Sequence, residues 1–167
     1  MLAGALRRML AFVALAMALS LAPSGAWAGS LEPVAAFYVG QIHLDLEVFH
    51  ASDGDKVGVL SIDNPLRIRG LPSAAIAIEP AQWPELIALW RAARAAVTGA
   101  EPWTPVGEIT EIDGSPFPVR LNLSAGPNVR FALGGTGGAV TFELSAADVE
   151  AMDQALVREQ SMLNSRK

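Results

Sequence analysis

The 167 residues contain no cysteine, which excludes disulfides, thiolate metal sites and cysteine nucleophiles. A formal net charge of −5 at pH 7 argues against a surface built to bind nucleic-acid phosphates. The length suffices for one domain that buries roughly two thirds of its unfolded surface, so no metal or covalent staple is needed for folding.

The N-terminus has the pattern of a secretory signal peptide. Arg7 and Arg8 precede the apolar run Met9–Leu21, and Ala26-Trp27-Ala28 is a small-x-small cleavage site. The run is shorter than the about 20 residues that a membrane span requires. We therefore predict a signal peptide over residues 1–28, a mature protein of the periplasm or the exterior, and no membrane span after cleavage. Cleavage removes two arginines and no acids, so the formal charge becomes −7.

The mature chain contains a similar sequence pattern twice, at a spacing of 66 to 67 residues. Val39–Ile42 matches Val106–Ile109, and Ile76–Trp83 matches Phe142–Val149. These matches predict a first unit over residues 29–98, a linker over 99–105, a second unit over 106–160 and a frayed tail over 161–167.

Each unit is predicted to contain four strands and one helix. In residues 42–48, apolar side chains alternate with His43, Asp45 and Glu47, which is typical of a strand with one solvated face. Turn residues separate the further predicted strands, which are 57–62, 66–69 and 74–78 in the first unit, and 106–112, 117–123, 129–133 and 139–144 in the second.

Helices are predicted after the last strand of each unit. Trp83, Leu86 and Trp90 recur on one helix face, as do Val149, Met152 and Leu156 in the second unit; this spacing predicts two helices that dock on the sheets. Because an interior proline disrupts a helix, we expect the first regular helix to begin at Pro84. Ser145 is expected to cap the second helix, with Asp148 as the capping-box acid. The expected fold class is α+β, a fused pseudo-dimer of two ββββα units.

The junction Ile76–Leu86, with its Pro-Ala-Gln-Trp turn, resembles the strand-to-helix junction of the positive-cofactor (p15-type) transcriptional coactivators. That family pairs two ββββα units, and the related whirly fold is similar. The resemblance implies binding of single-stranded DNA through basic side chains on the sheet. The candidate ligand-binding residues here would be Arg67, Arg69, Arg120 and Arg130. Four arginines in an exported acidic chain are a poor basis for binding nucleic acid. A protein that binds a small ligand or single-stranded nucleic acid through these arginines remains the alternative function.

Two further sets of residues are candidates for function. His43, Asp45 and Glu47 have a spacing at which three ligands could approach a divalent ion, as a metal-assisted hydrolase would require, although a solvated strand face explains them equally. Tyr38, Phe49 and Trp103 would mark a protein-partner surface if they are exposed together. No serine lies in a Gly-x-Ser-x-Gly elbow, and the glycines at 134–138 precede a strand rather than a helix.

The sequence therefore favours an exported accessory protein that has no catalytic activity. We expect it to need no cofactor and to bind a protein partner through a sheet surface or an edge strand.

Overall fold

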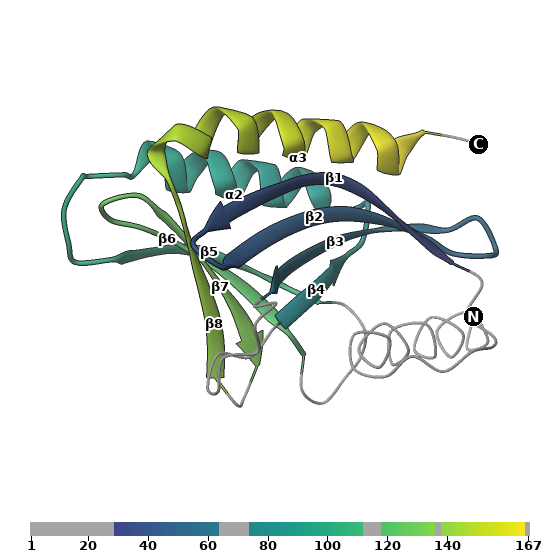
Figure 1. The fold of residues 1–167 in the computed structure, drawn as a ribbon, viewed down its shortest axis with the longest axis horizontal. Helices are drawn as coiled ribbons and strands as arrows, with labels where there is room; N and C mark the ends of the chain where they lie inside the picture. Colours follow the sequence, from purple (N-terminus) through teal and green to yellow (C-terminus); the bar gives the residue numbers. More distant parts are fainter. Residues whose placement is uncertain (1–28, 64–73, 112–117, 136–137, 166–167) are drawn as a thin grey trace.

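The computed structural model describes residues 29–63, 74–111, 118–135 and 138–165. These residues form two four-stranded antiparallel sheets and two helices in the order ββββαββββα (Figure 1). The predicted α+β class and the two ββββα units are thus confirmed. The predicted signal peptide and the strand expected at residues 66–69 lie outside the described residues.

Sheet A, from the first unit, has the strand order β1-β2-β3-β4. Its strands are β1 (Ser30–Val39), β2 (Ile42–His50), β3 (Lys56–Asp63) and β4 (Ala74–Ile78), and helix α2 (Trp83–Ala95) follows.

Sheet B, from the second unit, has the order β5-β6-β7-β8. It consists of β5 (Thr104–Thr110), β6 (Arg120–Ala125), β7 (Val129–Gly135) and β8 (Gly138–Leu144), and the short 3-10 helix η1 (Ala146–Asp148) leads into helix α3 (Val149–Asn164).

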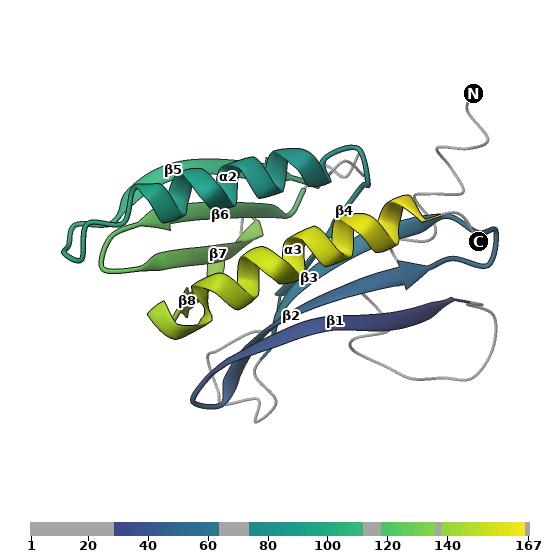
Figure 2. The same cartoon turned by 90° about the horizontal axis from the view of Figure 1, so that it is seen from above.

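Each helix covers the sheet of the other unit. Helix α2 packs on β5 and β6, whereas α3 packs on β1, β2 and β3, and the two helices lie side by side (Figure 2). The indole of Trp90 on α2 stacks on Phe131 of β7, with the ring centroids 5.9 Å apart. Each helix therefore buries most of its apolar face on the opposite sheet, although Trp83 at the start of α2 also lies against Gly58 of β3 in its own unit.

The core lies between the helix pair and the inner faces of both sheets. On β2 the inward side chains Leu44, Leu46 and Val48 are fully buried. The predicted helix stripes are confirmed, because Trp83, Leu86 and Trp90 are buried on α2 and Met152 and Leu156 on α3. Full burial of one large apolar side chain stabilises a fold by roughly 1.5–3 kcal/mol, so these stripes hold the exchanged helices in place.

Strand β1 corrects the expected start of the repeat. Val39–Ile42 is the turn between β1 and β2, where Gly40 has a φ of 63°, and it is not equivalent to the interior of β5. The two first strands instead match at bulges that follow Pro33 and Pro105. The bulge brings Val34 and Phe37, three residues apart, onto the buried face. This spacing breaks the period of two and hides the strand from pattern analysis.

Several predicted boundaries are also corrected. Helix α2 begins at Trp83, one residue before the expected Pro84, and the linker is shorter than 99–105 because β5 begins at Thr104. The Ser145 hydroxyl bonds to the Asp148 carboxylate and precedes η1, so it does not cap α3.

The tail does not fray from Ser161, since α3 continues to Asn164 with Leu163 buried. Lys56 of β3 holds this end of the helix. Its Nζ donates to the carbonyl oxygens of Met162 (2.8 Å) and Ser165 (2.9 Å).

Candidate functional site

The outer face of sheet A, turned away from the helices, carries a row of ionisable side chains. The alternation along β2 that buries Leu44, Leu46 and Val48 places His43, Asp45 and Glu47 on this opposite face. Antiparallel pairing then places Tyr38 of β1 beside His43 on one side and Asp63 of β3 on the other. We call His43, Asp45, Glu47 and Asp63 the acidic row.

The acidic row is centred on the imidazole of His43. Its Nδ1 lies 3.1 Å from Oδ2 of Asp45, and its Nε2 lies 3.6 Å from Oδ2 of Asp63, without the alignment of a hydrogen bond. The phenol ring of Tyr38 stacks on the imidazole, with centroids 5.5 Å apart and planes 7° apart. The imidazole is therefore held in place between two carboxylates and an aromatic ring.

Burial makes the negative charges of this row costly. Burial is the main reason why the pKa of Asp45 is raised, although the nearby His43 opposes the rise. Burial also raises the pKa of Glu47, and the charge of Asp45 adds to that rise. Three carboxyl groups share the row with one imidazole, so a positive charge placed here would be stabilised.

The row does not have the geometry of a metal centre. Among the described parts of the chain, no three His, Cys, Asp or Glu side chains come together in a way that could hold a metal ion. The metal-assisted hydrolase therefore gains no support from the positions of His43, Asp45 and Glu47.

Strand β1 borders the acidic row and is the outer strand of sheet A (Figure 2). Across the described ranges, five large hydrophobic side chains are exposed, and three of them are on β1: Leu31 (45%), Tyr38 (66%) and Val39 (46%). Apart from its pairing with β2, this strand makes no backbone–backbone hydrogen bond to another described residue, although its Val34 carbonyl oxygen accepts a hydrogen bond from Arg158 Nη1 of α3 (3.3 Å). One edge of β1 is therefore open to another strand.

The second-unit arginines lie on the outer face of sheet B, and each has an acidic neighbour. Arg120 Nη1 is 3.8 Å from Glu108 Oε1, and Arg130 Nη2 is 3.7 Å from Glu143 Oε2. The guanidinium of Arg130 also lies over the ring of Trp103, 3.6 Å from its centroid. Arg67 and Arg69 lie outside the described residues. Arg120 and Arg130 are at opposite ends of the β6–β7 pair and do not form one basic patch.

The three aromatic candidates are not exposed together. Tyr38 and Phe49 share the outer face of sheet A but lie at opposite ends of the β1–β2 pair. Tyr38 is opposite His43, and Phe49 is opposite Leu31. Trp103 belongs to the second unit, where it is half-buried beneath Arg130. Of this set, only Tyr38 contributes an exposed ring beside the acidic row.

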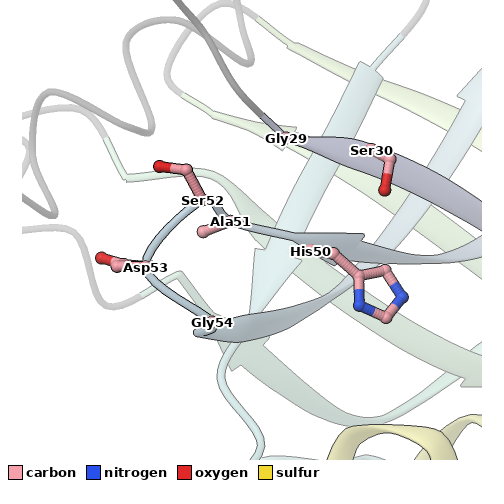
Figure 3. Close-up of a pocket in the computed structure, with 7 residues that line it drawn as sticks. All are labelled: Gly29, Ser30, His50, Ala51, Ser52, Asp53 and Gly54. Carbon is pink, nitrogen blue, oxygen red and sulfur yellow. The ribbon is translucent and has the colours of Figure 1, made fainter. Parts of the chain in front are cut away.

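A shallow pocket at the far end of β1 is lined by Gly29, Ser30, His50 and the turn that follows β2 (Figure 3). Its lining includes two serines, Ser30 and Ser52, but His50 and Asp53 are not paired as a catalytic triad requires. Nε2 of His50 is 2.8 Å from Oε2 of Glu32, whereas Ser52 and Asp53 point away from the imidazole. Asp53 instead accepts a hydrogen bond from the backbone N–H of Asp55.

Glu159 is a buried ionisable group that the sequence analysis did not single out. It lies in the apolar stripe of α3, fully buried against Gly58 and Trp83. Neither carboxyl oxygen has a hydrogen-bond partner of normal geometry among the described residues. Burial, and then the charge of Glu47, raise the pKa of Glu159 to about 9, although the nearby backbone N–H of Val59 opposes the rise. Its spacing from Met152 and Leu156 on the helix was the signal for this position.

None of the described helices is long and apolar enough to cross a membrane.

Comparisons with known proteins do not assign the chain to a family. No protein-family model matches the chain, and a search of curated proteins finds no significant match.

Proposed function

We propose that this protein is an exported, noncatalytic interaction protein that binds an extended segment of a partner protein alongside β1. The observation that carries the proposal is the concentration of exposed apolar side chains on an open edge strand. Soluble proteins normally protect such an edge with charges or cover it, because it can recruit another strand. Addition of a strand to a sheet edge is a common way of recognising a peptide.

The other sheet edges are less suited to this role. At the β4 edge, the N–H of Ala77 donates to the Glu111 carboxylate (3.2 Å), and β4 also contacts β7 of the second sheet. Strand β8 lies against sheet A and contacts three of its strands, β1, β2 and β3, whereas β8 is the one strand of sheet B among the main contacts of β1. Strand β5 carries none of the large exposed hydrophobic side chains found in the described ranges. The open edge and the apolar side chains coincide at β1.

Export is the second part of the proposal, and it rests on the pattern of residues 1–28. Expression of the full chain in a bacterial host, followed by fractionation and N-terminal sequencing, tests it. We expect a periplasmic product that begins at Gly29. A cytoplasmic product that retains Met1 would refute this part.

Peptide binding is tested by selecting peptides from a random ten-residue display library with the mature protein. We expect the selected peptides to slow amide hydrogen exchange in β1. The double variant Leu31→Ser/Tyr38→Ser should weaken their binding about tenfold, since buried aromatic and aliphatic anchors dominate such interfaces. Val157→Ser is the control, because the side chain of Val157 is as exposed as that of Leu31 (45%) but lies on α3. Failure to select any peptide, or protection confined to another strand, would refute the proposal.

A further inference from the structure

We infer that the segment bound at β1 carries a lysine or arginine whose side chain lies over Ala36 and whose charged head contacts the acidic row. This inference rests on the proposed function and specifies the chemistry of the partner. The relevant observation is that a strand added to β1 would be separated from the acidic row by β1 alone.

The side chains that β1 presents on the outer face leave a gap at Ala36. Tyr38 lies on one side of this position and Pro33 on the other, while Ala36 itself is exposed. Ala36 pairs directly with Asp45, and Pro33 pairs with Glu47. The methyl group of Ala36 is thus the only side-chain atom of β1 between an added strand and Asp45.

The dimensions of a sheet allow a long cationic side chain to cross this gap. Neighbouring strands are about 4.8 Å apart, so an added strand would lie about 10 Å from β2. Alternate residues of that strand would project onto the outer face, and one of them would lie beside Ala36. The methylene stem of lysine or arginine can cover an apolar surface while its charged head reaches a polar group. Such a stem would lie over Ala36, and its head would reach the Asp45 carboxylate.

The charge of the acidic row selects this occupant. The row contains three carboxyl groups and one imidazole, two of the carboxylates lie next to that imidazole, and the side chain of Asp45 is only 22% exposed. A cation from the partner would form charge-assisted hydrogen bonds with Asp45 and Glu47, whereas an acidic side chain would be repelled.

A second copy of the chain fits this edge poorly. The ten residues of β1 contain no lysine or arginine, and Glu32 is the one charged residue among them. Pairing of β1 with β1 of a second copy would therefore bring two acidic rows together, and β1 itself would supply no cation between them. The complementary occupant is a basic segment of a different protein.

The test uses three synthetic peptides of alternating valine and threonine that differ only in a central lysine, glutamine or glutamate. Their dissociation constants are measured with the mature protein at about 50 and 300 mM NaCl. We expect the lysine peptide to bind about tenfold more tightly than the glutamine peptide at low salt, the glutamate peptide to bind most weakly, and the differences to shrink at high salt.

Matched variants locate the charge effect. Asp45→Asn/Glu47→Gln should reduce the preference for the lysine peptide over the glutamine peptide to less than twofold. Glu108→Gln/Glu143→Gln, which removes two exposed acids from the outer face of sheet B, should leave the preference intact. Circular dichroism confirms that each variant is folded.

The outcomes separate this inference from the proposed function. Equal binding of the lysine and glutamine peptides, with both weakened by Leu31→Ser/Tyr38→Ser, would overturn the inference and keep the peptide-binding edge. A lysine preference that survives Asp45→Asn/Glu47→Gln would also overturn it. A protein that pairs through β1 into a dimer would overturn it in favour of a second copy. Absence of binding by all three peptides and by the selected library would refute the proposed function itself.

Discussion

Replacement of Glu159 by glutamine should stabilise this protein at neutral and alkaline pH. The carboxyl group is fully buried without a normal hydrogen-bond partner among the described residues, and its pKa is raised from 4.5 to about 9. The folded protein therefore holds the proton more tightly than the unfolded chain does. Below pH 4.5 both states are protonated and no pH-dependent cost arises.

The cost of this group grows between its two pKa values. As the pH rises from 4.5 to 9, unfolding releases the proton, and each pH unit lowers the free energy of unfolding by about 1.4 kcal/mol. At pH 7 the loss is about 3 kcal/mol. Above pH 9 both states are ionised and the cost no longer grows. Glutamine has nearly the same shape and does not titrate, but burial of its amide takes back roughly 1–3 kcal/mol of the gain.

Urea denaturation of the mature protein at pH 5, 7 and 9 measures this effect. We expect Glu159→Gln to flatten the fall in stability across this range, so that the difference between variant and wild type moves in favour of the variant as the pH rises. Glu150→Gln is the control, because Glu150 lies on the same helix with its side chain 68% exposed. If Glu159→Gln and the wild type lose stability in parallel from pH 5 to 9, the raised pKa assigned to the buried Glu159 carboxyl is refuted.

Three further predictions concern the packing that supports the site. Gly58→Ala should destabilise the fold by roughly 1–3 kcal/mol in urea denaturation, because the added methyl group would lie 2.8 Å from Cε3 of Trp83. Gly135→Ala is the control and should be close to neutral, because its methyl group would make an ordinary contact at 3.4 Å. Equal effects of the two substitutions would contradict this packing. Lys56→Met should lower the free energy of unfolding by roughly 1–3 kcal/mol and speed hydrogen exchange in the last turn of α3, whereas unchanged exchange there would refute its capping role. Cutting the chain in the exposed loop between α2 and β5 should yield two halves that fold as a 1:1 complex but not as separate monomers, because each helix packs on the sheet of the other half. Cooperative unfolding of either half as a monomer would refute this interdependence.

Much of the fold was predictable because it follows from short-range patterns. The alternation around His43, Asp45 and Glu47 fixes both the strand and its polar face, and the spacing of Trp83, Leu86 and Trp90 fixes the buried side of α2. Each pattern reflects the geometry of a single element, which the chain encodes within ten or so residues.

The candidate site was only partly predictable. The acidic residues of β2 were identified, but Asp63 joins them only through the pairing of β2 with β3. The sequence pattern does not predict strand β1, because its bulge disturbs the alternation of apolar and polar side chains. The open edge on which the proposed function rests therefore could not be predicted.

The local period of apolar residues is enough to predict the ββββα order, the buried stripes of the helices and the polar face of β2. The packing of the whole chain establishes that the helices exchange sheets, that β1 remains at an open edge and that Glu159 is buried without a normal hydrogen-bond partner among the described residues. An apolar stripe requires burial, but it does not specify which sheet provides it. That choice depends on how all the elements pack together.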